Sequence, residues 1–166
     1  MTGARTRSAA LAAEAVGLLI ARGETISTAE SLTGGLVAAA ITSVPGASAA
    51  FRGGVVAYAT DLKAAVLGVP DDLLEQHGAV HPAVAEAMAE GARARMWTTV
   101  GVATTGVAGP DPADGKPVGT VFIAVAGPGG TVCRELALAG DRAAIRRDTV
   151  ESALNLLAGS LREDIA

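Results

Sequence analysis

Aromatic side chains are scarce in this sequence of 166 residues, which has one Trp, one Tyr and two Phe. Proteins that bind single-stranded nucleic acid stack bases on aromatic side chains, and nucleic-acid binders in general carry a basic face or arm. This chain has a formal net charge of −4 and no run of Lys or Arg. We therefore expect no nucleic-acid partner.

Cysteine and histidine are also rare. The single Cys133 excludes an intramolecular disulfide and a cysteine-based zinc site, and it is interpreted as a small buried residue in a strand. His77 and His81 have the spacing of a metal-binding pair on a helix. However, Gly78 lies between them, and Pro82 moves His81 out of helical geometry. We expect loop or helix-entry roles for both histidines and no metal site, and a Ser-His-Asp triad has little support.

Long apolar runs are missing as well, because charge or Gly interrupts each one well before the roughly 20 residues of a membrane span. The Ala-rich N-terminal run contains Glu14 and has helical spacing, so it is not interpreted as a signal peptide. These absences predict a cytoplasmic protein without a membrane partner. The length fits one domain, residues 1–166.

Hydrophobic residues make up 50% of the chain, which also has 21 Gly, and their spacing predicts alternating helices and strands. In chain order we expect a helix over 5–22, a strand over 24–29, a helix over 36–42, a strand over 55–59, helices over 60–68, 70–78 and 82–95, strands over 98–105, 118–126 and 131–138, and a helix over 142–162. The last two strands form a hairpin, so one strand pair is antiparallel. The fold class is α/β, a three-layer α/β/α sandwich with a mixed β-sheet.

A glycine-containing turn, Glu30 to Gly35, connects the first strand to the next helix. The N-terminus of a helix attracts anions, because its unpaired N–H groups and its dipole point the same way. Ser31 and Thr33 are ordinary candidates for N-caps of that helix, and they are also candidates for substrate contact.

Two nucleotide-binding motifs are not present. The segment Gly109 to Lys116 resembles a phosphate loop, but the spacing of its glycines is wrong and Pro117 stands where Ser or Thr is required. No strand is followed by G-x-G-x-x-G, so the dinucleotide fingerprint is absent.

Lysine is used sparingly, since only Lys63 and Lys116 among the 13 basic residues are lysines. A buried lysine can lose its proton and act as a general base, which arginine does not do. Lys63 is therefore either a candidate base or an ordinary surface residue.

Six segments, in the same order along nearly the whole chain, resemble a single family. They are Thr28–Gly35, Val44–Val69, His77–Val80, Thr105–Asp111, Lys116–Val121 and Gly140–Arg147. The family is the C-terminal domain of the CinA proteins, whose characterised members are nicotinamide-nucleotide amidohydrolases. The sequence departs from it at Leu32, where relatives commonly have Cys, at His81, which is more often Ser, and in the loop Pro110–Gly115.

The resemblance implies hydrolysis of the carboxamide of nicotinamide mononucleotide to nicotinic acid mononucleotide and ammonia, without metal or other cofactor. By family analogy, Ser48 is the nucleophile, Lys63 its base, and Tyr58 assists proton transfer or orientation. An amine base activates a serine hydroxyl in this way. Amides near residues 46–49, or in the Gly34-Gly35 turn, are the expected oxyanion donors. The alternative for Ser48 is a cap of the segment 49–51.

The residues expected to contact the substrate are Ser31, Thr33, Gly34, Gly35, Thr105, Gly106, Arg142 and Arg146. Arg142 is the expected phosphate ligand because a bidentate guanidinium suits phosphate, whereas Arg146 pairs alternatively with an acidic residue. Two other functions stay open: a non-catalytic nucleotide-binding or protein-interaction module, and an amidase acting on another small carboxamide. The Ala-rich apolar composition is compatible with a homodimer.

Overall fold

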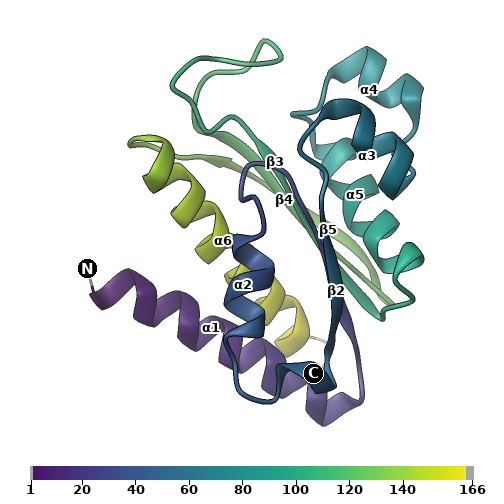
Figure 1. Ribbon diagram of the computed structural model, residues 1–166, viewed down its shortest axis with the longest axis vertical. Coiled ribbons are helices and arrows are strands. Elements are labelled where there is room, and N and C mark those ends of the chain that lie inside the picture. Colours follow the sequence, from purple (N-terminus) through teal and green to yellow (C-terminus); the bar gives the residue numbers. More distant parts are fainter. Residues whose placement is uncertain (1, 164–166) are drawn as a thin grey trace.

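The computed structural model describes residues 2–163, with side chains from residue 7 onward (Figure 1). Residues 1 and 164–166 of the predicted domain lie outside the described residues. The elements are α1 (Thr2–Arg22), β1 (Ile26–Glu30), α2 (Leu36–Thr42), the 3₁₀ turn η1 (Ala47–Ala49), β2 (Phe51–Val56), α3 (Thr60–Leu67), α4 (Asp71–His77), α5 (Pro82–Arg95), β3 (Val100–Gly106), β4 (Thr120–Gly127), β5 (Gly130–Ala137) and α6 (Arg142–Glu163). The predicted order of helices and strands is confirmed.

Five strands form one mixed sheet in the order β2-β1-β3-β4-β5. β1 is parallel to both β2 and β3, whereas β4 is antiparallel to β3 and to β5. The predicted hairpin is the β4–β5 pair. Every residue of β1 is buried, and so is nearly every residue of β3 and β4. This burial on both faces explains why these strands have little apolar–polar alternation.

Helices cover both faces of the sheet (Figure 1). α1, α2 and α6 pack on one face, where Leu19, Ile41 and Leu157 belong to a single buried cluster. α3 and α5 cover the other face, where Leu67 and Met88 belong to a second cluster, and α4 packs beside α5. The predicted three-layer α/β/α architecture is confirmed.

The carboxyl ends of the three parallel strands meet at one edge of the sheet, the upper edge in Figure 1. The segments that leave this edge are the turn 31–35 after β1, the residues 57–59 after β2, and the loop 107–119 after β3. In open α/β sheets, ligands bind outside the carboxyl ends of the strands. The topology therefore points to this edge for a functional site.

The structure differs from the prediction at β2, which begins at Phe51 rather than Val55 and ends at Val56 rather than Ala59. Gly53 and Gly54, which precede the predicted strand, lie inside the observed one. A Cβ on Gly54 would overlap Oγ1 of Thr28, its partner in β1. Glycine is present here because two strands approach closely, not because the chain turns.

Among the described helices, none is both long enough and apolar enough to cross a membrane.

Candidate active site

A cavity of about 300 Å³ opens at the carboxyl edge of the parallel strands. Its polar lining comes from the loops after β1, β2 and β3, from α3, and from the first residue of α6. The lining residues with polar or ionisable side chains are Ser31, Tyr58, Thr60, Lys63, Thr105, Asp111, Asp114 and Arg142. The fold thus gathers several of the predicted site residues from distant parts of the sequence.

Ser31 and Lys63 are in direct contact, with Lys63 Nζ 3.0 Å from Ser31 Oγ. Both are buried: Ser31, the first residue after β1, is 8% exposed, and Lys63 is 1% exposed. Nζ also donates to the carbonyl of Ala57 at 2.7 Å and to that of Tyr58 at 3.2 Å. A neutral amine has two N–H groups and one lone pair, so both N–H groups can donate hydrogen bonds to these two carbonyls. The lone pair then accepts the hydroxyl proton of Ser31.

The protonation of Lys63 is set mainly by its burial. Desolvation lowers the pKa of Lys63 from 10.5 to about 8, while the negative charge of Asp114 raises it. Lys63 also lies in the first turn of α3, where the positive end of the helix dipole disfavours a second positive charge. With a pKa of about 8, roughly one tenth of Lys63 is neutral at pH 7. Lys63 has the properties of a general base.

Ser48 is not brought to Lys63. It lies in η1, before the first residue of β2, in a separate surface hollow lined by the 42–48 segment and Phe51. Lys63 and Tyr58 follow the opposite end of β2, and a strand of this length spans roughly 20 Å at ~3.3 Å per residue. The structure therefore places Ser31, not Ser48, beside the predicted base.

Tyr58 and Arg142 meet at the rim of the cavity. Arg142 Nη2 is 2.9 Å from the Tyr58 hydroxyl, and Nη1 donates to the carbonyl of Gly109 at 2.6 Å. Tyr58 is 58% exposed, so its ring lies at the surface and not in the core. Arg142 joins the loops after β2 and β3 across the opening of the cavity.

The glycine-containing turn after β1 does not provide an anion site at the N-terminus of α2. Glu30, 1% exposed, accepts hydrogen bonds from the N–H groups of Val37 at 2.8 Å and Ala38 at 3.0 Å. The carboxylate of Glu30 therefore occupies the position expected for an external anion. Sequence analysis missed this role, although an acidic residue directly before a turn into a helix is a usable signal.

Thr33, Gly34 and Gly35 were expected to contact the substrate, but none of them lines the cavity. Thr33 is fully buried, and its Oγ1 lies 2.7 Å from Oγ1 of Thr104 in β3. Gly34 and Gly35 have positive φ angles of 57° and 102°, so their role here is to form the turn. Neither Ser31 nor Thr33 caps α2 through its side chain.

Thr105 and Gly106, the last residues of β3, line the cavity as expected. The Thr105 hydroxyl donates to the carbonyl of Ala79 at 2.7 Å, which fixes the 79–80 segment against the cavity. Arg146 is placed differently: it does not line the cavity, and its Nε donates to the carbonyl of Leu32 at 2.9 Å. Arg146 thus binds a backbone carbonyl, in place of the expected substrate contact and of the alternative ion pair.

Two acidic residues of the loop after β3, Asp111 and Asp114, also line the cavity, and sequence analysis did not select them. Asp114 Oδ2 accepts from the Ala79 N–H at 2.9 Å. The one sequence signal for them was that both carboxylates lie close together in the loop that follows β3. With Lys63 and Arg142 opposite, the cavity presents charges of both signs.

His77 and His81 stack with ring centroids 3.9 Å apart, and His81 Nδ1 accepts from the Ala83 N–H at the start of α5. The predicted helix-entry role of His81 is confirmed. Among the described residues, no group of three or more His, Cys, Asp or Glu is arranged to hold a metal ion. Cys133 lies in β5 and is only half-buried, and burial raises the pKa of its thiol to about 11.

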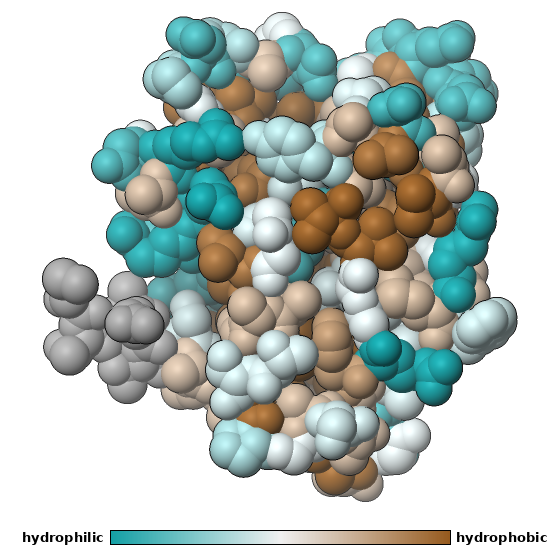
Figure 2. Space-filling view, viewed as in Figure 1, coloured by the Kyte–Doolittle hydropathy of each residue, from teal (hydrophilic) through white to brown (hydrophobic). Residues whose placement is uncertain are grey.

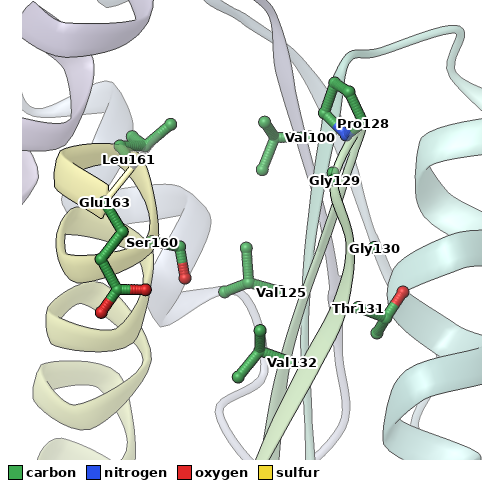
Figure 3. Close-up of a pocket in the computed structure, with 11 residues that line it drawn as sticks. Val100, Val125, Pro128, Gly129, Gly130, Thr131, Val132, Ser160, Leu161 and Glu163 are labelled. Carbon is green, nitrogen blue, oxygen red and sulfur yellow. The ribbon is translucent and has the colours of Figure 1, made fainter. Parts of the chain in front are cut away.

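Another hollow, of about 320 Å³, lies at the opposite edge of the sheet between the β4–β5 turn and the end of α6 (Figure 3). The side chains of Val100, Val125, Val132 and Leu161 project into it, with Ser160 and Glu163 on the helix side. The Ser160 hydroxyl donates to the carbonyl of Leu156 within its own helix. No basic side chain among the described residues lines this hollow, so Ser160 has no base beside it, unlike Ser31, which contacts Lys63.

Comparison with known proteins agrees with this architecture. The family model described as the CinA C-terminal domain matches residues 8–161. A CinA-like protein of Frankia casuarinae is 57% identical over 142 residues, which are 86% of this chain and 33% of the relative. A CinA-like protein of an Anaeromyxobacter strain is 54% identical over 153 residues, 92% of this chain and 37% of the relative. The chain therefore spans about a third of the length of these relatives.

Solved structures show the same fold at their full length. A competence/damage-inducible protein of Agrobacterium tumefaciens has a TM-score of 0.89 and 38% identity, covering 94% of this chain and 96% of that one. A competence-damaged protein superfamily member from Klebsiella pneumoniae has a TM-score of 0.90 and 32% identity, covering 94% and 98%.

Proposed function

The chain belongs to the CinA C-terminal domain family, and from this premise we propose that it hydrolyses the carboxamide of nicotinamide mononucleotide. The products are nicotinic acid mononucleotide and ammonia. The observation that carries the proposal is the 3.0 Å contact between Lys63 Nζ and Ser31 Oγ inside a cavity at the carboxyl edge of the sheet. The pair supplies the nucleophile and base that amide hydrolysis needs.

In the first step, neutral Lys63 takes the hydroxyl proton of Ser31, and Ser31 Oγ attacks the carboxamide carbon. The resulting tetrahedral intermediate carries its negative charge on the former carbonyl oxygen. The protonated Lys63 then gives its proton to the amide nitrogen, the C–N bond breaks, and ammonia leaves. An ester between Ser31 and the nicotinoyl group remains.

In the second step, water replaces ammonia. Lys63, neutral again, takes a proton from the water as the water oxygen attacks the ester carbon. Breakage of the bond to Ser31 Oγ releases the carboxylic acid, and the proton returns through Lys63 to Ser31. One pair of groups serves both steps, because Lys63 alternates between base and acid.

Charges around the cavity suit a zwitterionic nucleotide. Arg142 lies on the opening with donors in a planar fork, which matches phosphate. Asp111 and Asp114 lie in the same lining and suit a pyridinium cation or ribose hydroxyls. We assign the phosphate group of the substrate to Arg142, and its nucleoside to the part of the cavity lined by Asp111 and Asp114.

The test is ammonia release from nicotinamide mononucleotide by EDTA-treated protein, with Ser31→Ala and the matched control Ser48→Ala. We expect release by the wild type and by Ser48→Ala, and a loss of at least about 10³-fold in Ser31→Ala. If ammonia release is lost in Ser48→Ala alone, the nucleophile is Ser48, as family analogy implied.

Other outcomes separate the remaining functions. Equal release by all three proteins would keep the reaction and discard both serines. Bound but intact nucleotide would favour a non-catalytic binding module, and release from a different carboxamide in a substrate panel would favour a related amidase.

A further inference from the structure

The side chain of Arg146 lies against the turn that carries Ser31, outside the cavity. Its Nε donates to the carbonyl of Leu32 at 2.9 Å. A Cβ on Gly34 would lie only 3.3 Å from Arg146 Nη2, so the guanidinium is seated closely on the turn. Arg146 comes from α6, which packs on the sheet face opposite to the face that carries α3 and Lys63.

The two peptide groups that flank Leu32 are both held through their carbonyls. The Ser31 carbonyl accepts from the Gly34 N–H at 3.1 Å, and the Leu32 carbonyl accepts from Arg146. In a planar trans peptide the N–H points opposite to the C=O. The Leu32 N–H is therefore directed away from the inside of the turn.

The Leu32 N–H has no hydrogen-bond partner within the part of the chain that the structure describes. Leu32 lines the cavity directly after the nucleophile Ser31. Backbone N–H groups that are buried without a partner are rare in folded proteins, and a free N–H beside a nucleophile is suited to an oxyanion.

We propose that Arg146 is a positioning residue: by holding the Leu32 carbonyl, it fixes the turn so that the Leu32 N–H stabilises the oxyanion formed on attack by Ser31. This inference rests on the proposed amide hydrolysis. It assigns Arg146 a role through the backbone in place of the substrate contact expected from the sequence. Loss of the guanidinium frees the Leu32–Thr33 peptide to rotate, and the turn loses its fixed shape.

The first experiment compares Arg146→Ala and Arg146→Lys with Arg147→Ala, a neighbouring arginine that is exposed and paired with Asp148. Loss of an oxyanion donor costs about 10²–10³-fold in kcat, so we expect a fall of about 10- to 100-fold for Arg146→Ala with KM changed less than about threefold. Arg146→Lys keeps the charge but lacks the planar donor, so it is expected to be impaired as well. Arg147→Ala is expected to match the wild type.

The second experiment does not depend on the natural substrate. A fluorophosphonate reacts with an activated serine: the Oγ–P bond forms, the P–F bond breaks, fluoride leaves, and the serine proton passes to Lys63. The phosphoryl oxygen requires the same N–H donors as the amide oxyanion. We expect Ser31 labelling, followed by intact mass, to slow at least tenfold in Arg146→Ala and not in Arg147→Ala.

If the wild type is labelled at Ser31 but releases no ammonia, the proposed substrate is wrong. The labelling rates of Arg146→Ala and Arg147→Ala then decide the role of Arg146. Unchanged labelling in Arg146→Ala overturns the inference. A KM increase confined to nicotinamide mononucleotide, and absent with nicotinamide riboside, also overturns it in favour of a phosphate ligand. If circular dichroism shows that Arg146→Ala is unfolded, the same criteria apply to Arg146→Lys.

Discussion

Lys63 is the residue whose surroundings define the site most sharply. It is 1% exposed, its amine contacts two backbone carbonyls and the Ser31 hydroxyl, and burial lowers its pKa to about 8. A neutral amine in this position can accept a proton from Ser31, whereas an ammonium group cannot. The protonation state of a single side chain therefore controls the proposed reaction.

This control predicts a pH dependence. The neutral fraction of Lys63 rises tenfold per pH unit below its pKa and levels off above it, so kcat/KM is expected to rise with pH and to level off above pH about 8. The measurement is kcat/KM for ammonia release between pH 6 and 9.5. A profile without an ascending limb near pH 8 would contradict Lys63 as the base.

At this scale the sequence predicted part of the site. Lys63 stood out because lysine is rare in the chain, and Tyr58 and Arg142 were selected together with it. The partner of Lys63 was not found, since Ser31 lies 32 residues away and only the parallel pairing of β1 and β2 brings the two together. Arg146 was assigned to substrate because a sequence does not show that a backbone carbonyl will bind it.

The helices and strands were predicted in their correct order, and α2 and α5 with their correct ends. Apolar periodicity and the Gly and Pro residues at element ends carry this information. The ends of β2 were predicted wrongly because the strand was placed on the apolar run after Gly54, and glycine has low strand propensity. Here Gly54 faces the side chain of Thr28 across the parallel pair, a tertiary contact that no local pattern reports.

The close approach of β1 and β2 predicts the effect of adding a methyl group. Gly54→Ala places a Cβ against Thr28 Oγ1, and we expect a loss of about 1–3 kcal/mol in the free energy of unfolding. Gly17→Ala is the matched control, because nothing lies within 4 Å of its Cβ position in α1. The control is expected to be neutral or to stabilise by about 0.5–1 kcal/mol. Urea denaturation measures both, and equal stabilities would contradict the packing argument.

At the scale of the whole molecule, the parallel strands bring the loops that carry the site residues to one edge. The same arrangement leaves β2 at the border of the sheet. Figure 2 shows apolar side chains gathered on the face formed around β2 and α3. The exposed aliphatic residues on α2, β2 and α3 include Leu36, Val56, Leu62 and Val66, each between 38% and 47% exposed.

We propose a homodimer, with which the Ala-rich apolar composition is compatible, and sedimentation velocity tests it directly. We expect a species of twice the chain mass at micromolar concentration. A species of single chain mass at all concentrations would contradict the prediction.

The course of α6 has a practical consequence. The helix begins with Arg142 at the rim of the cavity and ends with Glu163 at the hollow of the opposite edge. Its 22 residues span roughly 33 Å at ~1.5 Å per residue. A fluorescent reporter attached to the side chain of residue 163 would thus lie on the far side of the molecule, and the entrance to the cavity would stay open to solution.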